Sequence, residues 1–158
     1  MTNEFVEHIR AFYATYRQEL YSYALSLTRS AEGAEDAVHN AFSRVLRNGR
    51  RPRDLRAYLF RCVRNAALDE RRSAVRRARD ASLFEPLETA GDSDDGRLEV
   101  EEMLHALSDD ERECIVLKLF SGLTFREIAK TRGVSLNTAA SWYRRGIMRL
   151  KARMENER

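Results

Sequence analysis

The sequence predicts an all-α protein made of two small helical domains joined by a flexible acidic linker. Apolar residues recur at helical spacing over most of the chain, as in amphipathic helices that pack on a core. The 158 residues include only 7 Gly and 2 Pro, fewer than a chain with many tight β-turns needs. A Gly- and Asp-rich stretch without periodicity separates the helical segments. We therefore expect one domain over residues 1–75, a linker over 76–97 and a second domain over 98–158.

Three helices are expected in the first domain. The first runs from about Glu4 to Leu27, with apolar residues at every third or fourth position. Ser30 is placed to cap a second helix, because its hydroxyl can accept from the N–H groups of the first turn. An apolar stripe follows over residues 34–45, until Asn-Gly at 48–49 breaks the pattern. Pro52 suits the first turn of a third helix.

The second domain begins with an expected helix near Leu98–Leu107. S-D-D-E at Ser108–Glu111 predicts a capping box ahead of an apolar helix that Gly122 ends. A second capping box, TFRE at 124–127, predicts a short helix that is followed by a turn at Gly133. Another cap, Ser135, begins a last helix that runs to about Met154. A short helix, a turn with Gly and a longer helix predict a helix-turn-helix.

Charge is distributed in blocks along the chain. Residues 47–79 hold 12 basic and 3 acidic side chains, a net charge of +9. Residues 80–113 have a net charge of −11, and residues 114–158 have one of +7. Two basic blocks separated by an acidic one favour two contacts with a polyanion, joined by a segment that avoids it. A single basic run would more simply be a solvated face.

The last helix has two chemically different faces. At 100° per residue, Thr138, Ser141, Arg145 and Arg149 gather opposite an apolar side that includes Ala139 and Tyr143. Polar and Arg side chains on a projecting helix suit contact with base edges in the major groove. Trp142 lies at the edge of this face, so packing against the preceding helix and direct contact with DNA both remain open.

Several other classes of protein are not favoured by the sequence. No apolar run reaches the roughly 18 residues of a membrane span, and the start of the chain does not resemble a secretory signal, so we expect a cytoplasmic protein without membrane insertion. The cysteines, Cys62 and Cys114, lie at apolar helical positions, which is typical of buried thiols. Because the sequence lacks a nucleophile–base pair, a phosphate loop and a metal cluster, we expect neither an enzyme nor a cofactor.

Both domains carry motifs that resemble the extracytoplasmic-function (ECF) type of bacterial RNA polymerase sigma factor. AEDAVHNAFSRVLRN and DLRAYLFRCVRNAALDERR are similar to region 2 of that family. LSDDERECIVLKLFSGLTFREIAKTRGVSLNTAASWYRRGIMRLK looks like region 4. The resemblance implies that the first domain binds the β′ clamp helices of core polymerase and melts the −10 element. It also implies that the second domain binds the −35 duplex and packs on the β flap.

The resemblance assigns a role to three groups of residues. Those that would face core polymerase are Glu35, Asp36, His39, Asn40, Ser43 and Arg44. Those near the −10 strand would be Arg53, Arg56, Arg61, Arg64, Asn65, Asp69, Arg71 and Arg72. Those at the −35 element would be Thr138, Ser141, Arg144, Arg145 and Arg149.

Opening a duplex also requires a surface on which unstacked bases can rest. Tyr58 or Phe60 could supply it, with core packing as the alternative role for both rings. The sequence departs from the family pattern at His39, where Gln is common, and at Tyr58, where Trp is common. Ala140 and Trp142 stand where basic residues are frequent, which leaves the −35 sequence open.

Two other functions remain as alternatives. The chain could be a stand-alone helix-turn-helix regulator, or a sigma-like decoy that binds an anti-sigma factor. A regulator binds duplex DNA unaided, whereas a sigma factor needs core polymerase. The sequence leaves open whether an anti-sigma factor binds this chain.

Overall fold

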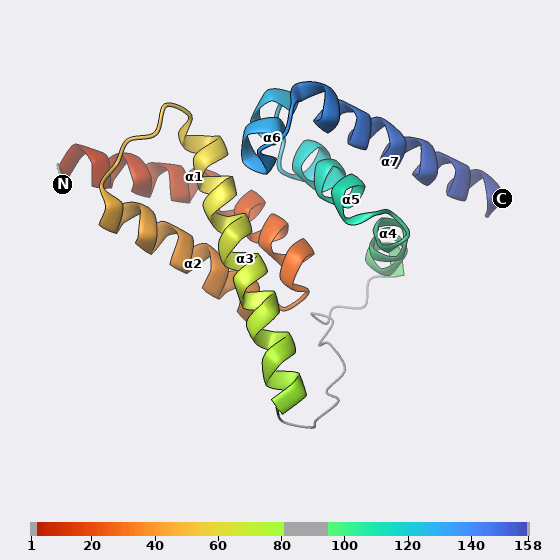
Figure 1. The fold of residues 1–158 in the computed structure, drawn as a ribbon, viewed down its shortest axis with the longest axis horizontal. Helices are drawn as coiled ribbons and strands as arrows, with labels where there is room; N and C mark the ends of the chain where they lie inside the picture. The colour runs from red at the N-terminus through yellow and green to blue at the C-terminus, as the bar shows by residue number, and fades with distance from the viewer. Residues whose placement is uncertain (1–2, 81–94, 158) are drawn as a thin grey trace. The chain divides into compact units, whose positions relative to one another are not determined.

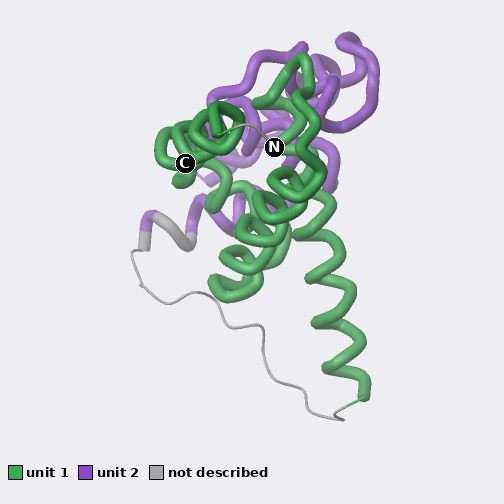
Figure 2. The backbone as a smooth tube through the Cα atoms, turned by 90° about the vertical axis from the view of Figure 1, so that its left-hand side faces the viewer, with its two compact units in different colours: residues 1–90 green, residues 91–158 purple. Residues whose placement is uncertain are grey.

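The structure is a computed structural model that describes residues 3–80 and 95–157; residues 1–2, 81–94 and 158 are not described. Within the described ranges the backbone forms seven α-helices and one π-helical turn, and it contains no strand, which confirms the all-α expectation. The chain divides into two compact units, Met1–Ala90 and Gly91–Arg158 (Figure 2). Most of the expected linker lies outside the described residues. None of the described helices is long and apolar enough to cross a bilayer.

Unit 1 is a bundle of three helices, α1 (Asn3–Thr28), α2 (Ala31–Asn48) and α3 (Leu55–Asp80), each packed against the other two (Figure 1). In the core the Tyr23 and Phe60 rings are fully buried, with their centres 5.9 Å apart. Small side chains of α2, including Ala34, Ala37 and Ala41, are also fully buried or nearly so, which lets the neighbouring helices come close. One face of each helix is left for solvent.

The helix ends of unit 1 follow local side-chain chemistry. Ser30 caps α2, as expected, and accepts a hydrogen bond from the Gly33 N–H at 3.1 Å. Gly49 ends α2 with a φ of 61°, a left-handed conformation that glycine adopts without strain. The expectation for Pro52 is wrong, because α3 begins only at Leu55. The Asp54 carboxylate accepts from the Ala57 N–H at 3.1 Å and sets that start.

Helix α3 is longer than the sequence analysis predicts. The expected first domain ends at residue 75 and the expected linker begins at residue 76, yet α3 continues to Asp80. Its side chains over residues 74–80 are all exposed, so apolar packing does not hold this segment. Ala and Arg have high helix propensity, and an ion pair of 3.1 Å joins Arg77 to Glu70. These turns project beyond the other two helices (Figures 1 and 2).

Unit 2 contains α4 (Asp95–His105), α5 (Asp109–Ile115), the π-helical turn η1 (Val116–Phe120), α6 (Phe125–Arg132) and α7 (Leu136–Asn156). Both α5 and α6 pack against α7 (Figure 1). The expected helix at Leu98–Leu107 begins earlier and ends earlier. The expected single apolar helix after Ser108 is instead α5 followed by the wider η1, before Gly122 turns the chain with a φ of 68°.

Capping in unit 2 matches the expectation at two of three helices. Thr124 and Glu127 form a complete capping box at α6, and Ser135 accepts from the Thr138 N–H at α7. Gly133 ends α6 with a φ of 66° and lies in the turn of the helix-turn-helix, between α6 and α7. At α5 the Ser108 hydroxyl accepts from the Glu111 N–H, but the carboxylate of this Glu pairs with a side chain of α7 instead. The capping box predicted there is thus only half formed.

Candidate nucleic-acid and polymerase interfaces

The six residues predicted to face polymerase lie together on α2. Its buried stripe of Ala and Val side chains packs into the bundle, so the opposite face points to solvent. Five of the six side chains are exposed, and Ser43 is half-buried. The face carries acidic, basic and neutral groups together, which suits a polar protein partner better than a polyanion. The exposed members are Glu35, Asp36, His39, Asn40 and Arg44.

Helix α3 presents a basic face. Arg61, Asn65 and Arg72 are exposed and recur at a spacing of three to four residues or its multiples, so they form one stripe. Asp69 lies at the edge of that stripe, with an ion pair of 3.6 Å between its carboxylate and Arg72. On the other side of the stripe Arg71 is exposed and Arg64 is half-buried, while Arg53 is exposed in the loop before α3.

Arg56 is set apart from this basic face. It lies three residues before Leu59 and four before Phe60, on the side of α3 that enters the core. Its guanidinium stacks over the Tyr16 ring of α1 at 5.0 Å, and its Nε is buried. This contact supports the packing of α1 on α3.

The two candidate stacking rings differ in accessibility. Phe60 is fully buried in the core, so the alternative of core packing holds for it. Tyr58 is half-buried on α3. Burial raises the pKa of the Tyr58 hydroxyl, and the neighbouring Cys62 thiol adds to the rise. Tyr58 therefore stays neutral and remains the aromatic side chain of α3 that a base could contact.

The two thiols should react at very different rates. Burial raises the pKa of Cys114 to about 11, and it also raises the pKa of the half-buried Cys62, where nearby Arg side chains and a hydrogen bond to Tyr58 oppose the rise. Because the thiolate is the nucleophile, we expect iodoacetamide at pH 8 to modify Cys62 slowly and Cys114 only after unit 2 unfolds. Mass spectrometry of the intact chain measures both sites. Equal rates under native conditions would contradict the packing of α5.

The raised pKa of Cys114 also determines how the stability of unit 2 changes with pH. Folded Cys114 keeps its proton up to about pH 11, whereas the ordinary thiol value is 9.0. Between these values the unfolded chain releases a proton that the folded chain retains. The contribution of this thiol to the stability of unit 2 is therefore complete below pH 9.0 and is lost as the pH rises toward 11.

The predicted DNA-reading face of α7 is only partly free. Arg144 and Arg145 are exposed, while Thr138 and Ser141 are half-buried. Arg149 has a side chain 60% exposed, yet one of its nitrogens lies 3.4 Å from the carboxylate of Glu111 on α5. Among the predicted −35 residues, Arg145 thus combines exposure with a place at the centre of the polar face.

A buried ionic cluster that the sequence analysis missed supports this helix. The Arg132 side chain of α6 is only 9% exposed and forms ion pairs with Asp110 at 2.6 Å and Glu113 at 3.0 Å. The same guanidinium lies 4.8 Å from the centre of the Trp142 ring. Trp142 therefore packs against the preceding helix, the first of its two open roles. A helical wheel of α7 alone shows the indole position but not the cation above it.

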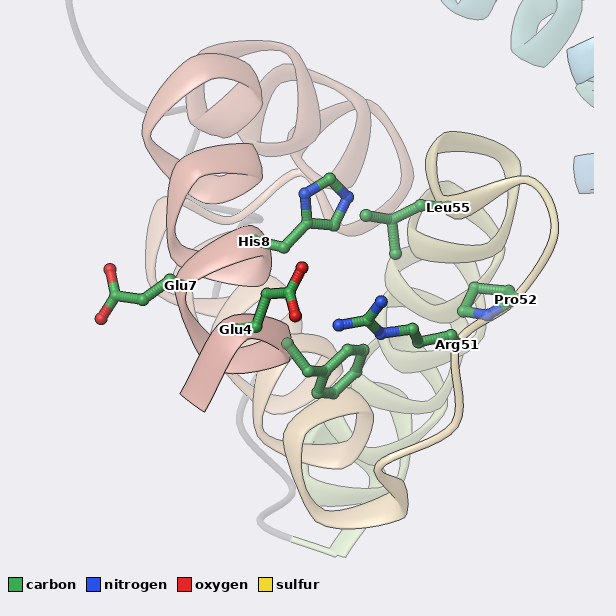
Figure 3. A pocket seen from close by; sticks show the side chains of 7 residues that line it. Glu4, Glu7, His8, Arg51, Pro52 and Leu55 are labelled. Atoms are coloured by element: carbon green, nitrogen blue, oxygen red, sulfur yellow. The ribbon is translucent and has the colours of Figure 1, made fainter. Parts of the chain in front are cut away.

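Unit 1 also contains a cavity of about 570 Å³ between the start of α1 and the loop before α3 (Figure 3). Glu4 and Arg51 point toward each other there, while Glu7 points away. Phe5, His8, Pro52 and Leu55 complete the lining. The lining includes none of the residues that the sequence analysis assigns to polymerase or DNA.

Comparison with known proteins matches the two parts of the chain to two regions of one protein family. The family model Sigma-70 region 2 matches residues 12–77, and the model Sigma-70, region 4 matches residues 97–150. The ECF RNA polymerase sigma factor SigL of Mycobacterium tuberculosis is 32% identical over 143 residues, covering 84% of this chain and 81% of its own. The chain belongs to the ECF sigma factor family. Sigma factors act in transcription initiation and are not enzymes, and region 4 is a DNA-binding region.

A further sequence relative and two solved structures with the same fold accompany this match. The ECF sigma factor SigK of Mycolicibacterium vanbaalenii is 29% identical over 158 residues, covering 92% of this chain and 81% of its own. The sigma factor RpoE, solved with the anti-sigma factor NepR from Bartonella quintana, has a TM-score of 0.73 at 23% identity, covering 96% of this chain and 99% of RpoE. CnrH, solved with the cytosolic domain of CnrY, has a TM-score of 0.72 at 24% identity, covering 95% and 89%.

Proposed function

We propose that this sigma factor binds core polymerase through the exposed face of α2 and directs it to promoters with two separate DNA surfaces. The basic face of α3 holds the non-template strand of the opened −10 element. The polar face of α7 contacts the −35 element as duplex. On core polymerase, unit 1 binds the β′ clamp helices and unit 2 binds the β flap.

The observation that carries this proposal is the placement of two unlike cationic faces on two separate units. The α3 face combines Arg61 and Arg72 with the half-buried ring of Tyr58. Backbone cations beside an aromatic ring suit single strands, since phosphates bind the cations and an unstacked base rests on the ring. The α7 face has Arg and hydroxyl groups at the start of a helix that follows a Gly turn, which suits the major groove of a duplex.

The comparisons bear on one further partner, an anti-sigma factor, and on one alternative function, the stand-alone regulator. The solved structures of RpoE and CnrH each contain a bound partner, NepR or the cytosolic domain of CnrY. We therefore add an anti-sigma factor to the proposed partners of this chain. A stand-alone regulator does not account for the match to region 2.

In vitro transcription tests the proposal. The purified chain is added to bacterial core polymerase on genomic fragments, and new start sites are mapped; a parallel gel shift uses the chain alone with the same DNA. We expect new starts only with core polymerase and little binding by the free chain. Tight binding of duplex DNA by the free chain, without any new start, would support the stand-alone regulator instead.

Reversing a charge on α2 should weaken binding to core polymerase. Asp36 is exposed in the middle of the α2 face. Asp36→Lys should lower the affinity for core polymerase about tenfold, because a charge of the wrong sign at an interface is costly. Glu7→Lys makes the same charge change on an exposed site of α1, 63% exposed, and should leave affinity within about twofold. Fluorescence titration of labelled chain with core measures both. Equal losses would show that net charge, and not the α2 face, governs the binding.

A further inference from the structure

Glu111 of α5 is a buried carboxylate whose ion-pair partner lies on the DNA-reading helix. Its side chain is 4% exposed, and its Oε1 lies 3.4 Å from a terminal nitrogen of Arg149. Its Oε2 is also buried and has no hydrogen bond within the described residues. A desolvated carboxylate attracts a cation more strongly than a carboxylate in water does. Arg149 therefore forms an ion pair with a carboxylate that is almost fully shielded from solvent.

Gly146 makes this contact possible. A Cβ at this position would lie 2.6 Å from Cδ1 of Ile115 and 3.4 Å from Cβ of Glu111. A side chain at this position would force the buried Ile115 side chain to shift, so glycine lets α7 lie this close to α5, and the two helices run side by side in Figure 1. The close approach places Glu111 beneath the segment of α7 that carries Arg149.

Arg149 is tethered but still accessible. Its side chain is 60% exposed, and it follows Arg145 by four residues and Ser141 by eight, on the same polar face. A guanidinium has five N–H donors in a rigid plane, so one edge can bind a carboxylate while the other donates to a second anion. A fixed donor loses less conformational entropy on binding than a free Arg side chain does.

We infer that Glu111 is a positioning residue for DNA recognition: it holds the Arg149 guanidinium at the surface of α7, where its free edge binds a backbone phosphate of the −35 duplex. The inference rests on the proposed function, because it assigns a partner to the same α7 face. Phosphate contacts set the register of a recognition helix on its duplex. Glu111 would thus help to set which bases Arg145 reaches, although it touches no DNA itself.

A competing electrostatic effect has the opposite sign, and it defines the test. A carboxylate near the DNA repels phosphates, so a purely electrostatic role predicts that any neutral residue at position 111 tightens binding. A positioning role predicts weaker binding when the acceptor is lost and a smaller effect when an acceptor without charge replaces it. Glu111→Met removes the acceptor while keeping a long side chain that tolerates burial, and Glu111→Gln keeps an oxygen acceptor.

The experiment uses holoenzyme assembled from full-length chain and bacterial core polymerase, on a promoter fragment that supports transcription. Apparent dissociation constants are measured over a series of salt concentrations for five variants. They are Glu111→Met, Glu111→Gln, Arg149→Ala, the double variant Glu111→Met with Arg149→Ala, and Arg145→Ala. Protection of Cys114 from iodoacetamide confirms that unit 2 of each variant is folded.

We expect Arg149→Ala to weaken binding about fivefold and to reduce the salt slope by about one phosphate contact. Glu111→Met should cause a similar loss and Glu111→Gln a smaller one, and the double variant should be no weaker than Arg149→Ala alone. Additive losses, or tighter binding by either Glu111 variant, would overturn the inference while the proposed function stands. If Arg145→Ala leaves promoter binding unchanged, or if the chain supports transcription from none of the fragments, the proposed function itself fails.

Discussion

Arg132→Ala should destabilise unit 2 by about 3–5 kcal/mol, the cost of removing one partner of a buried ion pair. The guanidinium is 9% exposed, and the Glu113 side chain that it neutralises is 7% exposed, so the variant leaves a carboxylate in the interior without its cation. The contact with Trp142 is lost as well. Trp142 is the single Trp of the chain and lies in unit 2, so its fluorescence during urea unfolding reports on this unit alone.

A matched control is available on the same helix. Arg126 of α6 is exposed, so Arg126→Ala should change stability by no more than about 0.5 kcal/mol. Glu113→Gln introduced into the Arg132→Ala chain should restore part of the loss, because a neutral amide is less costly to bury than a carboxylate that has lost its ion pair with Arg132. A loss below about 1 kcal/mol for Arg132→Ala would show that the cluster does not hold α6 against α5.

Arg145→Ala should weaken holoenzyme binding to an intact promoter by about 1–3 kcal/mol, the usual discrimination of one forked Arg–guanine contact. Arg145 is exposed at the centre of the polar face of α7, while Thr138 and Ser141 beside it are half-buried. Arg145→Lys keeps the charge but loses the fork, so it should retain only part of the affinity. Competition binding with promoter fragments measures the effect.

Scrambling the −35 element separates specific from general contacts. On a scrambled element the wild-type chain has already lost the base contact, so Arg145→Ala should cost much less there. Lys151→Ala removes an exposed charge from a different side of α7 and should weaken binding to both fragments about equally. An Arg145→Ala loss that is the same on both fragments would identify Arg145 as a phosphate contact and not a base contact.

Features that depend on a few neighbouring residues could be predicted from the sequence. The caps at Ser30, Thr124 and Ser135 each join a side chain to an N–H group three residues away, so the pattern contains both partners. The exposed face of α2 follows from the period of its buried Ala and Val residues. The three-helix bundle and the helix-turn-helix could be predicted for the same reason.

Features that depend on residues far apart in the chain could not be predicted from the sequence. The capping box expected at Glu111 fails because its carboxylate pairs with Arg149, which lies far along the chain. Arg56 and Arg132 are of a residue type that commonly binds DNA, but each packs on an aromatic ring of another helix. The end of α3 was missed because helix propensity, without any buried face, extends it to Asp80.

The central claim is that unit 2 recruits the promoter and unit 1 opens it. Permanganate reactivity of thymines in the −10 element, followed over time at increasing holoenzyme concentration, tests this claim most directly. The concentration at half-saturation reports on recruitment, and the maximal rate reports on opening. Three chains are compared with the wild type: Arg145→Ala on α7, the pair Arg61→Ala with Arg72→Ala on α3, and the exposed control Arg17→Ala on α1.

Arg145→Ala should raise the half-saturating concentration about tenfold and leave the maximal opening rate unchanged. The α3 pair should lower the maximal rate several-fold, with a shallower salt dependence and little change in half-saturation, because fewer phosphates of the open strand are neutralised. Arg17→Ala should change neither quantity. If Arg145→Ala and the α3 pair alter both quantities in the same proportion, promoter recruitment and opening are not separate functions of the two units.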